Sequence, residues 1–323
     1  MDKLLYYWKR NNWVISANYL FYDCERKKMD HPVFLIGNQG DGLTLVSRML
    51  RRHPQVVSVT GNSKYWAGAD EMQNVFEPVL PPELSGIRLR APKHKFLTPP
   101  RSWSYACDDL IDKYRKTDKD ANDYLEKRLK QIIGYVISRY GRNIDTPRFV
   151  DKSQVFTVKM SLINKLLEDC SPYFIHVTRN PYATCYRAAI GKAGDMRRYA
   201  KYLSLDERIK ICIQHWYNSA ICVEEDKDKV ANFMRIKFED LLCDPENVLK
   251  KICDFVGLEF SDDMIPQPHH KLPLGVKYRD RWYPLRPDIN RQYLEKIPEK
   301  YVDWIYQKCG KLARTYGYEP PEK

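Results

Sequence analysis

One short stretch of the sequence constrains the fold more than any other. An apolar run, residues 33–36, leads straight into a turn with glycines at positions 37, 40 and 42. Apolar residues at 45, 46, 49 and 50 then recur at helical spacing. This order predicts a buried strand, a tight loop and the start of a helix. In such a turn, backbone N–H groups and the positive end of the helix dipole converge on one spot, which suits a phosphate.

The loop does not match the two commonest phosphate-binding patterns. No Gly-Lys-Ser/Thr follows the glycines, so the loop is not a Walker A loop. Gly40-Asp41-Gly42 lacks a third glycine three residues later, so the dinucleotide fingerprint is also absent. Because many glycine-rich turns are only tight turns, this stretch alone leaves phosphate binding and a plain turn equally favoured.

A second segment of the same kind lies about 140 residues further along the chain. The apolar run at 173–177 ends in the polar turn Thr178-Arg179-Asn180-Pro181. Pro181 suits the first turn of a helix that starts after Asn180. Arg179 then lies at the carboxyl end of a buried strand, where open α/β sheets place ligand-binding residues. A salt bridge to a neighbouring carboxylate is the alternative role for this arginine.

These two segments, in this order, resemble the sulfotransferase family that uses 3′-phosphoadenosine 5′-phosphosulfate (PAPS), in particular its bacterial branch. The family loop, G-x-P-R/K-S-G-T-T, is matched here by Gly37, Gly42 and Thr44. The strand that ends in R-D/N-P is matched by Arg179-Asn180-Pro181. Further stretches keep the family order, at residues 150–153 with 162–167, at Trp216 with 235–245, and at 249–258. The likeness spans roughly residues 32 to 318.

The resemblance implies an α/β fold with a central parallel sheet flanked by helices, in a P-loop-like architecture. It also implies transfer of a sulfuryl group from PAPS to a hydroxyl or amine of a small-molecule or carbohydrate acceptor. The product would be 3′-phosphoadenosine 5′-phosphate (PAP), and no metal is expected. Arg179 would bind the 3′-phosphate. The residues implied for the rest of the cofactor are Gly37, Gly40, Asp41, Gly42, Leu43, Thr44, Leu45 and Arg187.

Several positions depart from the family pattern. Gly40 replaces the basic residue of the loop, Asp41 the serine, and Leu43 the first threonine. A carboxylate at 41 repels a phosphosulfate unless it turns away or pairs with a cation. Arg187 replaces a family serine, and a bidentate arginine can compensate for the lost hydroxyl. These departures keep an alternative open: a catalytically altered sulfotransferase-like protein that binds a nucleotide or another anionic ligand.

A basic and aromatic loop at residues 277–286 resembles the late loop that covers the cofactor in cytosolic family members. Lys277, Arg279 and Arg281 are the candidates for contact with the 3′-phosphate. Trp282 is the candidate for stacking on adenine. The alternative is a solvated loop whose aromatic residues pack on the body of the protein.

By analogy with phosphoryl transfer, sulfuryl transfer needs aligned reactants, a positive charge near the leaving oxygen, and a base for the acceptor proton. The helix start at Thr44 and the side chain of Lys152 are expected to supply the charge. Glu71 and His94 are the candidate bases, with Asp70 beside Glu71. Lysines on both sides of His94 favour its neutral form. For each of these residues an ordinary surface role is the alternative.

Composition narrows the class of ligand. The chain has 323 residues and a formal net charge of +12, which favours anionic partners. Nucleic acid is the rival to a nucleotide, but no recognisable nucleic-acid module accompanies the charge. A P-loop kinase is disfavoured because the Walker lysine is missing. Nine cysteines without a C-x-x-C pair indicate reduced thiols in a cytoplasmic protein.

The expected organisation is an N-terminal extension at residues 1–30 and one sulfotransferase-like domain at 31–323, although two closely packed domains would also fit the length. Residues 67–147, which include a helical pattern at 121–139, are expected to form an acceptor-side insertion. A loop at 261–290 and a helical tail complete the chain. No membrane span is expected, and the oligomeric state stays open.

Overall fold

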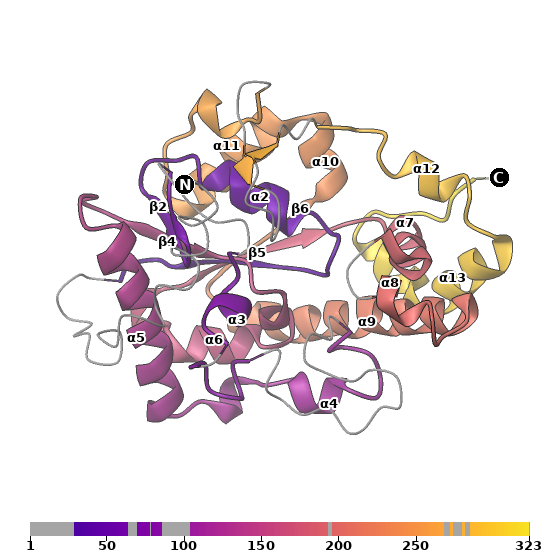
Figure 1. Cartoon of the computed structure of the whole chain (residues 1–323), viewed down its shortest axis with the longest axis horizontal. Helices are drawn as coiled ribbons and strands as arrows, with labels where there is room; N and C mark the ends of the chain where they lie inside the picture. The colour runs from indigo at the N-terminus through magenta and orange to yellow at the C-terminus, as the bar shows by residue number, and fades with distance from the viewer. Residues whose placement is uncertain are drawn as a thin grey trace.

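The computed structural model describes residues 29–63, 70–77, 79–85, 104–192, 196–267, 272–273, 280–281 and 285–322. Within them, helices cover both faces of a six-stranded sheet (Figure 1). The strand order is β3-β2-β4-β1-β5-β6. The strands are β1 (Val33–Ile36), β2 (Val56–Ser58), β3 (Gly61–Asn62), β4 (Arg148–Asp151), β5 (Tyr173–Thr178) and β6 (Asn232–Lys237).

The sheet is mostly parallel, as the family resemblance implies. The pairs β2–β4, β4–β1, β1–β5 and β5–β6 are parallel, and β3 returns antiparallel to β2 as a short edge strand. β1 lies between β4 and β5, which come much later in the chain, so the central strand is flanked on both sides by crossover connections. The carboxyl ends of these three strands therefore meet at one edge of the sheet, where open α/β folds bind ligands.

Alternating residues of the central strand enter two separate cores, which explains why the run at 33–36 is apolar throughout. Val33 and Leu35 pack with helices α2 (Leu43–Leu50), α10 (Phe238–Cys243) and α11 (Pro245–Val256). Phe34 and Ile36 face the opposite side. A strand buried on both faces must be apolar at every position.

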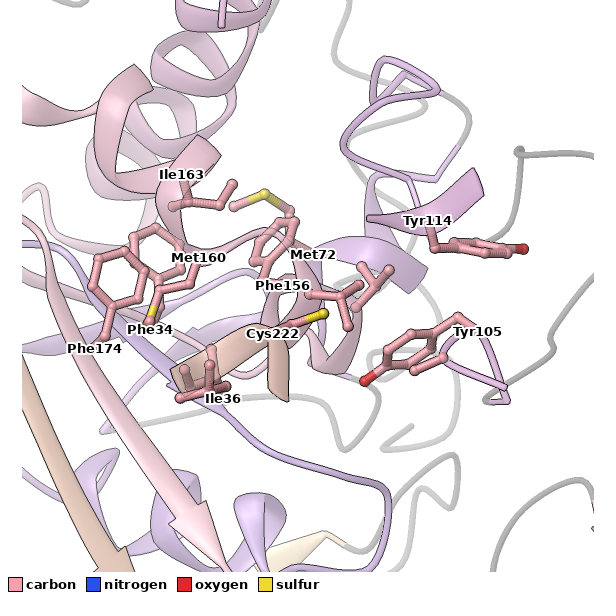
Figure 2. Close-up of a cluster of buried hydrophobic side chains, with 14 of the residues drawn as sticks. Phe34, Ile36, Met72, Tyr105, Tyr114, Phe156, Met160, Ile163, Phe174 and Cys222 are labelled. Atoms are coloured by element: carbon pink, nitrogen blue, oxygen red, sulfur yellow. The ribbon is translucent and has the colours of Figure 1, made fainter. Parts of the chain in front are cut away.

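The second core is larger and rich in aromatic residues. Phe34 stacks on Phe174 with ring centroids 5.6 Å apart, and it meets the ring of Phe156 edge-on at a centroid distance of 5.9 Å (Figure 2). It also meets the ring of Phe149 edge-on, at 6.2 Å. The helices that contribute buried residues to this core are α3 (Met72–Val75), α4 (Ile111–Tyr114), α5 (Asp123–Tyr140), α6 (Met160–Leu166), α7 (Pro181–Arg187), α8 (Met196–Tyr199), α9 (Leu205–Asp226) and α13 (Glu299–Thr315). In Figure 1, α2, α10 and α11 lie on one side of the sheet and α5, α6 and α9 on the other.

The remaining elements are short. They are the helix α12 (Arg291–Leu294), the single turns η3 (Asp118–Asp120), η4 (Gln154–Val158), η5 (Glu168–Cys170), η6 (Ala188–Lys192), η7 (Lys227–Lys229) and η8 (Asp262–Met264), and the strands β7 (Leu272–Pro273) and β8 (Asp280–Arg281). β7 and β8 pair antiparallel. The segment at 261–290 is therefore not only loop, because it contains a helical turn and this small pair of strands.

Helix ends follow the local signals of the sequence. The side chain of Asn180 accepts hydrogen bonds from the backbone N–H groups of Tyr182 and Ala183, and α7 begins at Pro181 as predicted. Ser204 and Glu207 form a capping box at the start of α9. No helix among the described residues is long and apolar enough to cross a membrane. The expected N-terminal extension lies almost entirely outside the described residues.

Candidate active site

The glycine loop follows β1 and the Arg179 turn follows β5, the neighbouring parallel strand. Three glycines of the loop have positive φ angles: 146° at Gly37, 100° at Gly40 and 102° at Gly42. A Cβ atom at Gly37 would lie 2.4 Å from the carbonyl oxygen of Val177, and one at Gly42 would lie 2.1 Å from Cδ2 of Phe238. Both positions therefore require glycine, because the backbone conformation and the close neighbours exclude a side chain.

Hydrogen bonds on its buried side fix the conformation of the loop. The Gly37 N–H donates to Oγ1 of Thr157 over 2.8 Å, and the Thr157 hydroxyl lies 3.1 Å from the Gly37 carbonyl oxygen. The Asn38 N–H donates to Oδ2 of Asp41 over 2.9 Å. The Asp41 carboxylate is thus turned into the protein, where the residue is 1% exposed. Burial raises the pKa of Asp41 to about 7, against the opposing effects of the Asn38 N–H group and the charge of Arg179.

Helix α2 begins directly after the loop. The N–H groups of Leu45 and Val46 donate to the carbonyl oxygen of Gly42. The N–H groups of Leu43 and Thr44 come before the first intrahelical hydrogen bond, so the helix supplies no acceptor for them. This leaves two backbone donors and the positive end of the helix dipole at the mouth of the loop.

A cavity of about 330 Å³ opens at this helix start. It is lined by Asn38, Gln39, Gly40, Gly42, Leu43, Thr44, Leu45, Arg48, Glu71, Gln154, Arg179, Arg187, Phe238 and Ile289. Three arginines and one glutamate carry the charge of this lining, so the cavity favours an anion. Gly37, Asp41 and Lys152 are not part of the lining.

Arg179 is 3% exposed and is fixed at the cavity wall by neighbours from three segments. Nη1 donates to the carbonyl oxygen of Gly40 over 2.7 Å, and Nε and Nη2 donate to Oδ1 of Asn290 over 2.8 and 2.6 Å. The guanidinium also lies over the ring of Phe238, 4.8 Å from its centroid. These contacts use three of the five N–H donors, which leaves two for a ligand. Burial and the charge of Arg187 lower the pKa of Arg179.

Lys152 lies in a buried ion-pair cluster next to the cavity. Its Nζ atom is 2.8 Å from Oε1 of Glu71 and 3.1 Å from Oδ1 of Asp70. Burial lowers the pKa of Lys152, but the two carboxylates outweigh that effect and raise it. Asp70 also pairs with Arg51, and although burial opposes it, the charges of Lys152 and Arg51 hold the pKa of Asp70 below its usual value.

Glu71 is the candidate base that the structure places in the cavity lining. Besides Lys152, it accepts hydrogen bonds from the side-chain amides of Gln73 and Asn74 on its other oxygen, at 2.8 and 2.5 Å. The turn that carries Glu71 is itself held on β4, because Asp151 accepts from the Met72 N–H group. Glu71 is thereby fixed in position, and its proton-accepting role stays a prediction.

Several residues in the cavity wall or next to it were not predicted from the sequence. Arg48 lies four residues after Thr44, and this i,i+4 spacing on one helix face was an available signal. Phe238 and Asn290 carried no such signal, because they reach Arg179 from segments 59 and 111 residues further along the chain.

Other predicted residues lie outside the described part of the chain: His94, Lys277, Arg279 and Trp282. Arg281 contributes backbone to β8, and its side chain is not described. Within the described residues, no group of three or more His, Cys, Asp or Glu side chains could hold a metal ion. The eight cysteines of this part of the chain are free thiols.

The comparisons with known proteins agree with this fold. The model of the Sulfotransferase family matches residues 32–262, and the chain belongs to this family. A search of curated proteins finds no match.

Three solved structures share the fold. The sulfotransferase domain of the Synechococcus PCC 7002 olefin synthase matches with a TM-score of 0.53 at 18% identity, over 91% of this chain and 98% of that domain. The sulfotransferase domain from the curacin biosynthetic pathway matches with a TM-score of 0.50 at 17% identity, over 91% of this chain and 100% of that domain. Sulfotransferase STF9 from Mycobacterium avium matches with a TM-score of 0.50 at 12% identity, over 93% of this chain and 80% of that protein. At these identities the likeness shows the fold.

Proposed function

We propose that the protein transfers a sulfuryl group from PAPS to a hydroxyl or amine of a small-molecule or carbohydrate acceptor. The observation that carries this proposal is the cavity in which the helix start at Thr44 meets Arg179 and Arg187. A nucleotide with phosphates at both ends of its ribose needs two separate positive sites. The loop and the arginines from the neighbouring strand and helix supply them.

In this proposal the glycine loop and the first turn of α2 bind the 5′-phosphosulfate, and Arg179 binds the 3′-phosphate. The two guanidinium N–H groups that Asn290 and Gly40 leave unused serve as its donors. Arg187 lies beside the loop, since its Nη1 atom is 3.1 Å from the position of a Cβ atom on Gly40. It therefore supplies a further charge-assisted contact.

The reaction breaks the bond between the sulfur and the oxygen of the 5′-phosphate and forms a bond from sulfur to the acceptor oxygen or nitrogen. The electron pair of the broken bond stays on the phosphate, which leaves PAP, and the acceptor proton goes to a base. Glu71 is our candidate for that base, because it lines the cavity. Lys152 holds one of its carboxylate oxygens at 2.8 Å and so orients it.

Isothermal titration of the chain with PAP, and separately with ATP and Mg²⁺, tests the class of ligand. We expect PAP to bind and ATP with Mg²⁺ to bind at least tenfold more weakly, because the cavity offers an arginine for the 3′-phosphate and the loop lacks the Walker lysine. Tighter binding of ATP with Mg²⁺ would contradict the proposal.

The second candidate is a protein that keeps the binding site but has altered or lost sulfuryl transfer. Gly40 and the buried carboxyl of Asp41, in place of the basic residue and the serine of the family loop, favour it. Sulfur-labelled PAPS, incubated with the protein and a panel of phenols, alcohols, amines and sugars, separates the two. Labelled product supports the enzyme, whereas PAP binding without any product supports the altered protein.

A further inference from the structure

Arg187 is the cavity-lining arginine whose charged end lies beside the glycine loop. It is the last residue of α7, the helix that begins at Pro181 directly after the Arg179 turn. Side chains on a helix tilt towards its N-terminus, so the long side chain of Arg187 can reach back towards that turn. Its Nη1 atom lies 3.1 Å from the position of a Cβ atom on Gly40. The guanidinium of Arg187 is therefore at the loop itself.

This guanidinium is available to a ligand. Within the part of the chain that the structure describes, no hydrogen bond or ion pair joins it to another residue. The other two cations that were considered for the loop are engaged elsewhere. Arg179 donates to Gly40 and Asn290, and two carboxylates lie within 3.1 Å of the Lys152 Nζ atom. All five N–H donors of Arg187 can therefore serve an anion in the cavity.

Arg187 shares the cavity with a second cation. The charge of Arg187 lowers the pKa of Arg179, an effect that is exceeded by burial and opposed by Asp41 and Glu239. Both arginines line the cavity. Two like charges at one site repel each other, and an anion bound between them removes that repulsion. The pair of arginines thus favours a ligand that carries more than one negative charge.

Gly40 leaves open the space that the end of Arg187 occupies. Apart from the chain neighbours of Gly40, the Arg187 Nη1 atom is the one described atom within 4 Å of a Cβ position there. A long side chain at residue 40 would have to compete with the guanidinium for this space. The family pattern has a basic residue at position 40 and a serine at position 187. The two departures from it are therefore one exchange, in which the positive charge moves from the loop to α7.

We propose that Arg187 replaces the basic residue of the loop and binds the 5′-phosphate oxygen that leaves during sulfuryl transfer. This inference rests on the proposed function, in which Arg179 binds the 3′-phosphate. As the sulfur–oxygen bond breaks, its electron pair moves onto the 5′-phosphate oxygen, and the guanidinium stabilises the charge that develops there. The helix start at Thr44 supplies the N–H donors of the same phosphate site, and α7 supplies its cation.

Nucleotides with a single charged end test this assignment without knowledge of the acceptor. Adenosine 5′-phosphosulfate lacks the 3′-phosphate, and adenosine 3′-phosphate lacks the 5′ group. In isothermal titration, Arg187→Ala should raise the Kd for adenosine 5′-phosphosulfate and for PAP about 10- to 100-fold, the scale of a charge-assisted contact. The Kd for adenosine 3′-phosphate should change less than about threefold. Arg187→Lys should restore part of the lost affinity, because it keeps the charge.

A double-mutant cycle tests whether the two positions share one space. In the wild-type background, Gly40→Lys places a second side chain where the Arg187 guanidinium lies. Added to Arg187→Ser, the same change returns the cation to the loop. The effect of Gly40→Lys on the Kd for adenosine 5′-phosphosulfate should therefore be at least about threefold more favourable in the Arg187→Ser background. The backbone strain at Gly40, which has φ of 100°, is common to both backgrounds and cancels in the cycle.

Arg314→Ala is the matched control. This arginine is exposed at the end of α13 and contacts Tyr306 and Glu319, neither of which lines the cavity, so all three Kd values should stay unchanged. Unchanged binding of adenosine 5′-phosphosulfate by Arg187→Ala, or an equal loss for adenosine 3′-phosphate, overturns the assignment of Arg187. Equal effects of Gly40→Lys in both backgrounds overturn the exchange of the two positions. Wild-type protein that binds no PAP overturns the proposed function, and this inference with it.

Discussion

At the scale of single residues, two side chains connect the sequence motifs to the chemistry of the cavity. Arg179 is held with two N–H groups turned away from its protein partners. Asp41 is buried where the family loop has a hydroxyl, so its charge state changes the charge of the loop. Each gives a prediction that can be tested by binding alone.

Replacing Arg179 should separate ligands with and without a 3′-phosphate. Arg179→Ala should weaken PAP binding by about 1.5–3 kcal/mol, because a charge-assisted contact is lost. Adenosine 5′-phosphosulfate, which has no 3′-phosphate, should lose at most about threefold in affinity, since only the support of the Gly40 carbonyl is removed. Calorimetry with both ligands checks this, and equal losses would show that Arg179 does not bind the 3′-phosphate.

The pKa of about 7 for Asp41 predicts that anion binding depends on pH near neutrality. An anion in the loop is repelled by the ionised carboxylate, so the protonated form binds it better. Below pH 7 Asp41 is protonated and affinity is highest, and above pH 7 affinity falls as the proton is lost. Arg179 and Glu239 act on the same carboxyl with opposite signs.

Adenosine 5′-phosphosulfate is the suitable probe for this effect, because its charge does not change between pH 5.5 and 8.5, whereas the 3′-phosphate of PAP titrates in that range. Its Kd should rise severalfold from pH 6 to pH 8.5 in the wild-type protein. Asp41→Asn keeps an acceptor for the Asn38 N–H group and should make the Kd nearly independent of pH. A wild-type Kd that does not change between pH 6 and pH 8.5 would show that the charge of Asp41 does not affect anion binding.

At the scale of elements, the loop between β1 and α2 works because other segments pack against it. Phe238, the first residue of α10, fills the space beside Gly42 and also supports the guanidinium of Arg179. Thr157, in η4, holds both backbone groups of Gly37. The loop conformation therefore depends on elements far from it in the sequence.

Two alanine substitutions in the loop should differ for this reason. Both Gly40 and Gly42 have φ near 100°, so either substitution costs about 1–2 kcal/mol of backbone strain. At Gly42 the new methyl group also collides with the Phe238 ring, which adds about 1–3 kcal/mol. At Gly40 it meets only the movable end of Arg187, 3.1 Å away. Chemical denaturation should rank Gly42→Ala as clearly less stable than Gly40→Ala, and similar losses would argue against the collision.

At the scale of the whole molecule, the C-terminal part of the chain supports the strand ends that carry the cavity. Asn290 accepts from Arg179 and donates to Glu239. Tyr318 lies 3.0 Å from both Thr178 Oγ1 and Glu239 Oε2 through its hydroxyl. Glu239 in turn accepts from the Asn180 N–H group, so three distant segments hold the turn after β5.

Removing one of these supporting residues should therefore weaken the binding of a ligand that the residue itself does not touch. Asn290→Ala should raise the Kd for PAP about threefold to tenfold, because Arg179 loses the acceptor of the two hydrogen bonds that orient its guanidinium. Adenosine 5′-phosphosulfate should bind as before, because it has no 3′-phosphate for Arg179 to bind and Asn290 itself does not line the cavity. Asn247→Ala, at an exposed helix start, is the control and should leave both Kd values unchanged. A PAP affinity equal to that of the wild type would show that Arg179 keeps its position without Asn290.

Local sequence patterns determined much of the fold. The apolar runs at 33–36 and 173–177, the glycines that follow the first, and Asn180-Pro181 after the second predicted β1, β5 and the start of α7, because each is a property of adjacent residues. The order of the sulfotransferase motifs along the chain then predicted the mostly parallel sheet.

The sequence could not determine which way the Asp41 carboxylate turns, or that Asn290 and Phe238 meet at Arg179. Nor could it show that Asp70 and Glu71 neutralise Lys152 while Arg48 lines the cavity. Those features depend on burial and on contacts across more than fifty residues, which exist only once the sheet has brought its strand ends together.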